Sequence, residues 1–473
     1  MTLIGRTAEQ DELGRLCESP RAEFAVVYGR RRVGKTFLIR EYFGGSFAFY
    51  ASGVAGGKAS VQLKGFEQGL KAAGDSGGVL ADWWDAFERL RTILSMPNAK
   101  RDEASGKRVV FIDEMPWLDT PRGDFLAALE LFWNTWGSAQ PDLLLIACGS
   151  ATSWIVDKLL KNRGGLHNRV TSRIKLAPFT LSECESYFEV NGLTVTRQHV
   201  IEAYMAFGGI PYYFDLMHRR LGIVQNIDRL CFAENAPLKT EFDDLYHSLF
   251  KRAERHVAIV RALSGKGYGM TRDEVSRATK IANGGTLTKT LSELEECGFI
   301  RSYRSFGKKK SGLLYQLIDP FTLFYLRFVE DATDPHFWSN RHQSSQVNSW
   351  RGYAFELVCL LHSGQIKTAL GIAVIASDMC SWRSKGHDPA AQIDLVIDRS
   401  DGIIDLCEMK WAGREYSITK SYSAKLRDKM DVFAAETNTR KALRLVLVTP
   451  FGLKANAYAN DVQAAIAADD LFS

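Results

Sequence analysis

A glycine-rich stretch near the start of the sequence has the residue types and spacing of a phosphate-binding loop. Gly29 is followed by four residues and then by Gly34, Lys35 and Thr36, which is the pattern G-x-x-x-x-G-K-[ST]. Glycines let the backbone turn until consecutive N–H groups point at phosphate oxygens, and the helix that follows adds its positive end. In such a loop the lysine reaches the outer phosphates and the threonine holds Mg²⁺. We therefore predict nucleotide binding here rather than a purely structural turn.

The other residues of the loop, and the first residue after its threonine, are assigned to the same nucleotide site. They are Arg30, Arg31, Arg32, Val33 and Phe37. The task of the three arginines stays open, because they could meet phosphate, a neighbouring domain or only water. Ahead of the loop, a Gly5-Arg6 turn either packs against the nucleotide base or simply precedes a capped helix.

The segment VVFIDE at 109–114 places an acidic pair at the end of an apolar strand. Such a pair is common by itself, but after a phosphate loop and one intervening strand it has the form of a Walker B motif. Asp113 is then expected to hold the water shell of Mg²⁺, and Glu114 to polarise the attacking water. The pair therefore predicts hydrolysis of the bound nucleotide.

Four further candidate residues follow this pair. Ser150 ends a buried strand, where it could sense the γ-phosphate or cap the next helix. Arg169 is the preferred member of a basic group for reaching the γ-phosphate of a neighbouring subunit, with an ordinary exposed arginine as the alternative. Gly209 and Pro211 could bring a lid loop to the nucleotide, although proline is also natural at the first turn of a helix.

Four residues near the C-terminus could together cleave phosphodiester bonds. They are Glu356 in a helical stretch, Asp394 at the opening of a strand, and Glu408 and Lys410 in the next strand. Side chains at i and i+2 of a strand share a face, and an Asp-Gly turn at 401 and 402 could form a hairpin that brings Asp394 beside them. The three carboxylates are hard ligands suited to Mg²⁺, and Lys410 would orient water and steady phosphate charge. E-x-K alone is also a normal exposed strand pattern.

The elements that must position the first group are strands separated by helical stretches. Apolar runs at 24–28, 46–52, 109–112, 142–150 and 173–179 are typical of strands. The loop follows the first run directly and precedes a helical stretch, which is the context that a phosphate loop requires.

Residues 251–330 have the pattern of a winged helix-turn-helix, with three helices followed by two strands. Thr271 and Glu274 form a capping-box pattern before the second helix. The third helix would present Thr286, Thr288 and Lys289 to DNA phosphates, and the basic turn of the wing would present its lysines. The wing lysines are Lys308, Lys309 and Lys310. A protein-interaction module with a solvated turn is the alternative, because the third helix also carries three glutamates.

Length and composition indicate a multidomain globular protein. The 473 residues suggest about three domains, and 46% hydrophobic with 24% charged residues is far from a disordered profile. A net charge of +5 is too mild to argue for nucleic acid by itself. The eight cysteines include no C-x-x-C pair, which favours a reducing compartment over a disulfide or zinc framework. No apolar run approaches membrane-spanning length, so we expect a cytoplasmic protein without a membrane partner.

The set IGR, YGRRRVGKT, FIDE, ACGS, NRVTSRIKLAPF and GGIPYYF resembles the archaeal-type ATPases, P-loop ATPases related to AAA+ and STAND proteins. The resemblance covers roughly residues 1–250. It implies a five-stranded parallel sheet with a helical lid, an ATP-controlled conformational switch and assembly into homo-oligomers. In related STAND proteins the G-x-P element contacts nucleotide, which implies that role for Gly209 and Pro211.

The C-terminal set resembles the PD-(D/E)xK nuclease fold, which archaeal-type ATPases commonly carry. The chain departs from the motif because Gln392-Ile393, and not proline, precedes Asp394. The expected fold is therefore multidomain α/β: an ATPase core at 1–180, a helical lid at 181–250, a winged helix at 251–330 and a nuclease-like domain at 331–473.

These expectations combine into one hypothesis and two alternatives. The hypothesis is an ATP-hydrolysing switch, dependent on ATP and Mg²⁺, that controls a Mg²⁺-dependent DNA nuclease. In the first alternative the chain is an ATP-gated signalling or DNA-binding protein whose C-terminal domain does not cut. In the second it remodels protein partners.

Overall fold

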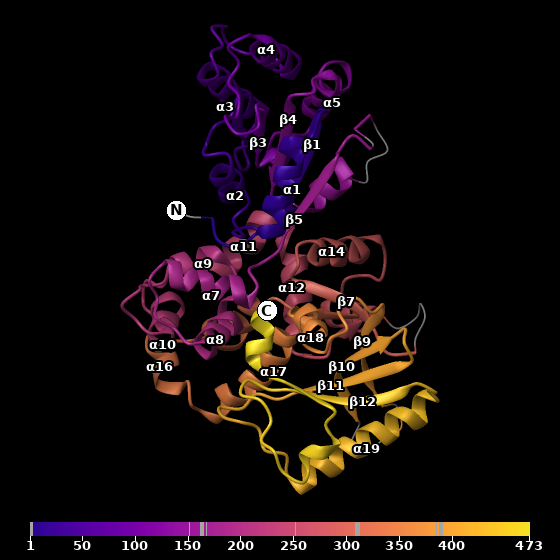
Figure 1. The fold of residues 1–473 in the computed structure, drawn as a ribbon. Coiled ribbons are helices and arrows are strands. Elements are labelled where there is room, and N and C mark those ends of the chain that lie inside the picture. Colours follow the sequence, from indigo (N-terminus) through magenta and orange to yellow (C-terminus); the bar gives the residue numbers. More distant parts are fainter. Residues whose placement is uncertain are drawn as a thin grey trace. The chain divides into compact units, whose positions relative to one another are not determined.

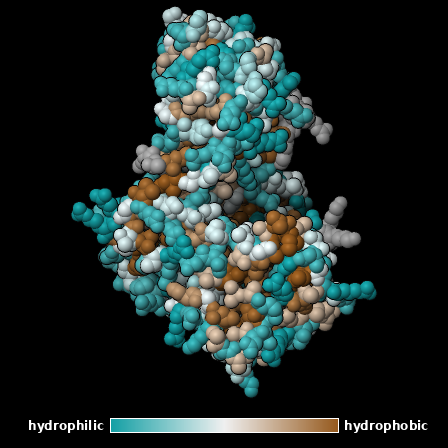
Figure 2. All heavy atoms as spheres, viewed as in Figure 1, coloured by the Kyte–Doolittle hydropathy of each residue, from teal (hydrophilic) through white to brown (hydrophobic). Residues whose placement is uncertain are grey.

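The computed structural model describes residues 3–150, 152–160, 165–166, 168–250, 252–307, 313–384, 386 and 391–473. The chain divides into two compact units, Met1–Pro178 and Phe179–Ser473 (Figure 1). On the face drawn in Figure 2, hydrophilic residues predominate and hydrophobic ones lie in separate patches. Within the described ranges, no helix is both long and apolar enough to span a lipid bilayer.

The first unit contains a five-stranded sheet with the order β2-β3-β4-β1-β5, in which every neighbouring pair is parallel. Its strands are β1 (Glu23–Gly29), β2 (Phe49–Ser52), β3 (Arg108–Asp113), β4 (Leu143–Gly149) and β5 (Ser172–Leu176). This confirms the parallel α/β sheet expected for the N-terminal region. Two strands are shorter than the apolar runs at 46–52 and 173–179. Pro178, which has no N–H to donate to a ladder, follows β5 closely.

Helices and short turns connect these strands. They are α1 (Thr7–Glu18), α2 (Lys35–Tyr42), α3 (Ala59–Ala72), α4 (Trp83–Ser95), η1 (Met115–Trp117), α5 (Phe125–Thr135), η2 (Gly137–Ala139), α6 (Thr152–Ile155) and η3 (Val156–Leu160). β3 and β4 are buried along their whole length, as parallel strands covered on both faces require. The Asp82 carboxylate caps α4, and the aromatic face of α4 packs Trp83 against Phe125 of α5 with ring centroids 4.9 Å apart. Sheet and helices therefore share one apolar core.

The second unit begins with a helical region. Its elements are α7 (Leu181–Val190), α8 (Arg197–Phe207), α9 (Pro211–Asp215), α10 (Ile223–Ile227), η4 (Asp228–Phe232) and α11 (Glu241–Leu249). α7 starts where it does because Thr180 and Glu183 form a capping box. Among the described elements of 181–249 there are only helices.

A small α/β module follows. It consists of α12 (Ala253–Ser264), β6 (Met270–Thr271), α13 (Arg272–Thr279), α14 (Gly285–Glu296), β7 (Ile300–Arg304) and β8 (Leu313–Leu317), with the strand order β6-β8-β7. Thr271 and Glu274 form the capping box that the sequence predicts at the start of α13. β6 is an addition to the predicted three helices and two strands; it pairs with β8.

The rest of the second unit surrounds a second five-stranded sheet, with the order β13-β12-β11-β10-β9. Its elements are α15 (Pro320–Phe324), η5 (Tyr325–Val329), α16 (Phe337–Arg341), α17 (Ser345–Leu361), α18 (Ser363–Ala369), β9 (Ser377–Arg383), β10 (Gln392–Arg399), β11 (Ile403–Met409), α19 (Lys420–Thr437), β12 (Ala442–Val448), η6 (Ala459–Asp461), β13 (Ala464–Ile466) and η7 (Ala468–Phe472). β9, β10 and β11 are antiparallel, whereas β11, β12 and β13 are parallel. The predicted hairpin between Asp394 and Glu408 is present as β10 and β11.

The edge strand β9 joins this sheet to the small module. Ser305, just beyond β7, forms a parallel bridge with Ser381, and the Phe306 N–H donates to the Ser381 carbonyl at 2.9 Å. The ring of Phe306 packs on Phe433 of α19 with centroids 4.9 Å apart. The module and the second sheet thus share both hydrogen bonds and apolar contacts.

Candidate functional site

The predicted phosphate loop lies between β1 and α2, where its function requires it. Gly34 is the N-cap of α2 with φ +91°, a left-handed conformation that favours glycine. At Gly29, with φ +148°, a Cβ atom would lie 2.3 Å from the Leu176 carbonyl oxygen. The backbone conformation therefore favours glycine at both positions. At Gly29 the close approach of β5 also leaves no room for a side chain.

Lys35 is buried at the centre of the loop. Its Nζ donates to the carbonyls of Gly29 and Arg30 at 3.1 and 2.8 Å and to the Ser150 hydroxyl at 3.1 Å. The ammonium group thus lies among oxygen atoms of the loop and of the end of β4. The oxygens of a phosphate at the loop would be negatively charged, and they would therefore accept stronger hydrogen bonds from the ammonium group than the neutral carbonyls do.

Thr36 and Asp113 face each other between α2 and the end of β3. The Thr36 hydroxyl donates to Asp113 Oδ2 at 2.9 Å. A hydroxyl and a carboxylate this close can serve one Mg²⁺ ion, directly or through its water shell. The donor set therefore fits the predicted magnesium site.

Glu114 has a left-handed backbone, with φ +43° and ψ +40°. A non-glycine residue in this region is strained, and such strain often marks a functional site. Its carboxylate accepts a hydrogen bond from the Ser150 hydroxyl at 2.6 Å and from the Ser150 N–H at 3.3 Å. Ser150 therefore bridges Glu114 and Lys35.

The remaining loop residues and the preceding turn surround the same place. The Arg6 guanidinium donates to the Val33 carbonyl at 3.1 Å, so the Gly5-Arg6 turn reaches the loop itself. Arg30 is buried, Arg31 and Arg32 are half-buried, and Phe37 is exposed. The signal for Arg6 in the sequence was its turn with Gly5, but its partner was not predictable from spacing.

Arg169 belongs to the first unit, whereas Gly209 and Pro211 belong to the second. Arg169 is exposed in the loop before β5. Gly209, with φ +63°, accepts a hydrogen bond from the Phe179 N–H at 2.7 Å, and Pro211 opens α9. Both therefore have local structural roles in the second unit, and their contact with nucleotide stays a prediction.

In the second unit, the four C-terminal residues converge at the ends of β10 and β11. Asp394 Oδ2 accepts the Met409 N–H at 3.0 Å, and Lys410 Nζ lies 3.8 Å from Asp394 and 3.5 Å from Glu408. Lys410 follows the last residue of β11, although its N–H still donates to the Val448 carbonyl at 2.9 Å. The predicted proximity of Asp394, Glu408 and Lys410 is therefore present.

Burial and mutual repulsion set the protonation of this group. Burial, followed by the charge of Asp394, raises the pKa of Glu356 to about 8. Burial and then the charge of Glu408 also raise the pKa of Asp394. Burial alone would lower the pKa of Lys410, but the charges of Glu408 and Asp394 outweigh it and raise that pKa. The carboxylates of the two strands therefore contribute to the raised pKa of Glu356, which lies on α17.

Two residues of α19 that the sequence did not assign complete this group. Lys429 Nζ donates to both carboxylate oxygens of Glu408, at 2.7 and 2.8 Å, and the Tyr422 hydroxyl donates to one of them at 3.3 Å. From spacing alone, Lys429 could face DNA or solvent. Among the residues that the structure describes, no three His, Cys, Asp or Glu side chains are arranged to hold a metal ion together. The observed arrangement of Glu356, Asp394 and Glu408 therefore does not fit a formed Mg²⁺ site.

The third helix of the small module, α14, exposes polar side chains in its first turns, and Lys289 there lies 3.8 Å from Glu293. Thr286, Thr288 and Lys289 are exposed on it. Two of its three glutamates turn to their own module: Glu293 pairs with His256 at 2.8 Å, and Glu295 accepts the Ser302 N–H at 2.8 Å. The wing lysines at 308–310 lie outside the described residues.

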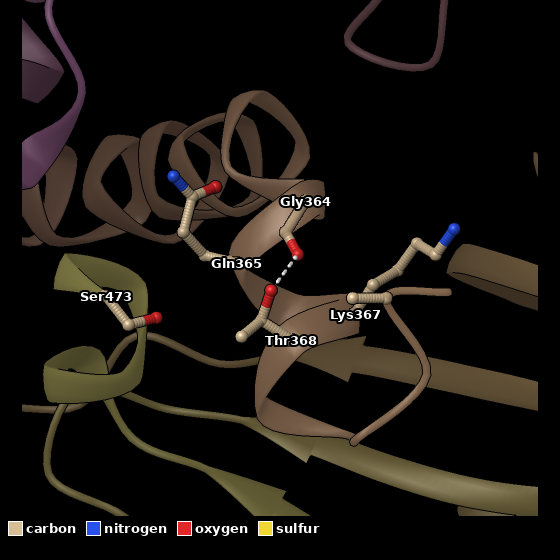
Figure 3. Close-up of a pocket in the computed structure, with 6 residues that line it drawn as sticks. Gly364, Gln365, Lys367, Thr368 and Ser473 are labelled. Atoms are coloured by element: carbon tan, nitrogen blue, oxygen red, sulfur yellow. Dashed lines mark hydrogen bonds between the residues drawn. The ribbon is translucent and has the colours of Figure 1, made fainter. Parts of the chain in front are cut away.

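A separate pocket of about 360 Å³ lies beside α18 (Figure 3). It is lined by Gly364, Gln365, Lys367, Thr368, Ala373 and Ser473. The Thr368 hydroxyl donates to the Gly364 carbonyl at 3.2 Å. None of the predicted site residues lines this pocket.

Comparison with known proteins finds remote relatives. No protein-family model matches the chain. An uncharacterized protein of Methanocaldococcus jannaschii, MJECL04, is 24% identical over 415 residues, which cover 86% of this chain and 87% of that protein. Among solved structures, the Walker-type ATPase PABY2304 of Pyrococcus abyssi is 19% identical with a TM-score of 0.47, over 69% of this chain and 96% of that one. The Aeropyrum pernix ORC2 protein, solved in ADPNP–ADP complexes, is 14% identical with a TM-score of 0.41, over 68% and 93% of the two chains.

Proposed function

We propose that the first unit binds and hydrolyses ATP. The observation that carries this proposal is the hydrogen-bonded link from Lys35 through Ser150 to Glu114, beside the pair formed by Thr36 and Asp113. These five side chains come from α2 and from the ends of β3 and β4 of a parallel sheet. Ligands of open parallel α/β sheets bind at that edge.

The proposed roles follow from the contacts of each group. The N–H groups of residues 29–34 and the Lys35 ammonium bind the phosphates, and Arg30, Arg31, Arg32, Val33 and Phe37 complete the nucleotide site. Thr36 and Asp113 hold Mg²⁺, which offsets phosphate charge when bound. Glu114 orients the attacking water and accepts its proton.

Lys35→Ala tests this proposal. The variant should lose ATP hydrolysis by about 100-fold or more, because it removes the cation that stabilises the developing phosphate charge. Hydrolysis is measured by phosphate release, and nucleotide affinity by fluorescence of a labelled ATP analogue. Lys64→Ala, at an exposed position of α3, is the matched control and should hydrolyse ATP at the wild-type rate. Wild-type hydrolysis by Lys35→Ala would contradict the proposal.

We further infer that ATP acts on this chain as a conformational switch, with 181–250 as its lid. Gly209 and Pro211 are the lid residues assigned to nucleotide, and Arg169 the residue assigned to a neighbouring copy. Arg169→Ala should then lower ATP hydrolysis only at protein concentrations that support oligomers, whereas an equal effect at every concentration argues for a role within one chain.

A second proposed function, for the second unit, is cleavage of DNA by a PD-(D/E)xK-like domain at 331–473. It is favoured by the convergence of Asp394, Glu408 and Lys410. The charges of this group also act on the pKa of Glu356. The small module at 251–330 is proposed to be a winged helix that contacts DNA phosphates through the exposed Thr286, Thr288 and Lys289 of α14. The contacts of Glu293 with His256 and of Glu295 with the Ser302 N–H support this, since they direct both carboxylates toward their own module.

Cleavage of plasmid DNA with Mg²⁺, with and without ATP, tests the second function. Nicking should disappear in Asp394→Ala and in Lys410→Ala, while both variants keep the ATPase activity of the first unit. Salt-dependent DNA binding without cleavage would instead favour an ATP-gated DNA-binding protein. Stimulation of ATP hydrolysis by protein and indifference to DNA would favour a remodeller.

A further inference from the structure

Lys429 and Glu408 form an ion pair within the carboxylate group, by which we mean the side chains of Glu356, Asp394 and Glu408. Glu408 is 1% exposed, and both of its oxygens accept from the same ammonium group, at 2.7 and 2.8 Å. Charge-assisted hydrogen bonds of this length are strong, and the buried position limits competition from water. Lys429 reaches this place from α19, which packs on the sheet through Phe433 and its apolar neighbours.

Among the described residues, two lysines and two further carboxylates lie around Glu408. β10 supplies Asp394, the residue after β11 supplies Lys410, α17 supplies Glu356, and α19 supplies the Tyr422 hydroxyl beside Lys429. The two lysines face the carboxylates of Asp394 and Glu408, so the group carries its own positive charge. No further cation is needed to compensate these two carboxylates.

A divalent cation at this place would compete with Lys429 for the oxygens of Glu408. Mg²⁺ binds carboxylate oxygens at about 2.0–2.1 Å, so a Mg²⁺ ion on Glu408 would lie close to the Lys429 ammonium. Their like charges also repel strongly at such a distance. Among the described residues these carboxylates form no three-ligand site, and Lys429 pairs with both oxygens of Glu408.

We propose that Lys429 is an internal cation that holds the carboxylate group closed, and that a divalent cation binds there only when Lys429 leaves Glu408. The proposal rests on the second proposed function, which assigns these carboxylates to a metal. Lys429 is then a positioning residue that controls access to Glu408. Its side chain is 25% exposed, so it can turn toward solvent or toward a phosphate of bound DNA without unpacking α19.

The Lys429→Met variant tests this with full-length protein free of nucleotide. Mn²⁺ alone is the probe, and binding is measured by isothermal titration calorimetry. Lys429→Met should bind Mn²⁺ at least about tenfold more tightly than the wild type, because the competing charge is gone. Lys410, 3.5 Å from Glu408, remains as a partner for the carboxylate. Lys429→Gln replaces the methionine variant should that one not fold.

Three controls identify the site. Lys425→Met removes an exposed lysine one turn earlier on α19 and should leave Mn²⁺ affinity unchanged. Lys429→Arg keeps the charge and should bind like the wild type. Asp394→Ala, added to Lys429→Met, should abolish the gain, which separates this site from Mn²⁺ bound near the phosphate loop.

Equal Mn²⁺ affinity in the wild type and in the Lys429 variants would overturn the proposal, as would a gain that survives Asp394→Ala. The outcome is distinct from that of the nuclease test. Tighter Mn²⁺ binding without DNA cleavage supports the internal cation and contradicts the nuclease function. Wild-type protein that cuts DNA and binds Mn²⁺ as tightly as Lys429→Met supports the nuclease function and contradicts the internal cation.

Discussion

Ser150 is the residue that links the ammonium group of the phosphate loop to the carboxylate proposed to activate water. Its hydroxyl lies 3.1 Å from Lys35 Nζ and 2.6 Å from Glu114. When Lys35 moves to a phosphate, this link must lengthen or break. The Ser150 hydroxyl and N–H still donate to the Glu114 carboxylate, so the serine holds the proposed base in position.

Ser150→Ala should therefore change turnover more than binding. We expect kcat for ATP hydrolysis to fall about tenfold, because Glu114 loses its hydroxyl partner and its position, with KM changed less than threefold. Steady-state phosphate release measures both parameters. Ser95→Ala, at the exposed end of α4, is the control and should leave them unchanged. A large rise in KM with kcat unchanged would show that Ser150 serves binding alone.

At the scale of elements, a buried imidazole fastens the start of α7 to the end of α17. His362 Nε2 accepts the Leu181 N–H at 3.0 Å, and Nδ1–H donates to the Val358 carbonyl at 2.8 Å. The Leu181 N–H is one of the donors that a helix start leaves without an intrahelical partner. This arrangement requires the neutral ring, and burial accordingly lowers the pKa of His362.

The stability of the second unit should depend on pH through this residue. Because the pKa of His362 is lower in the folded chain, the unfolded chain binds the proton first, near its ordinary pKa of 6.5. The free energy of unfolding is then fully retained above that pH and decreases as the pH falls below it. Urea denaturation at pH 7.5 and 5.5 should show this decrease in the wild type and a smaller one in His362→Gln. His336→Gln, at an exposed position, should behave like the wild type; equal decreases in all three proteins would contradict the assignment.

At the scale of the whole molecule, the features predictable from sequence are those encoded over short distances along the chain. The spacing of Gly29, Gly34 and Lys35 predicts a loop between strand and helix, and Thr271 with Glu274 predicts a capped helix start. The hairpin that brings Asp394 to Glu408 follows from alternation and a turn signal.

The contacts that sequence reasoning missed depend on where one element packs against another. Lys429 and Glu408 are 21 residues apart, and their ion pair requires α19 to lie on β11. Arg6 and Val33 are 27 residues apart and meet only because α1 lies beside the loop. The periodicity of the sequence does not predict either contact. A basic residue on a helix has the same sequence pattern around it whether its side chain meets solvent or a buried carboxylate.

The bridge between Ser305 and Ser381 has a consequence for any DNA that the second unit engages. It ties the small module to the edge of the sheet that carries Asp394 and Glu408, and the rings of Phe306 and Phe433 reinforce the joint. DNA bound by α14 would therefore lie at a fixed distance from the carboxylates of Asp394 and Glu408. The protein would then act as a molecular ruler, cutting at a set distance from the site that α14 binds. Cleavage of end-labelled DNA that carries one high-affinity site should give fragments of a single length. A spread of fragment lengths would mean that the small module moves relative to the sheet.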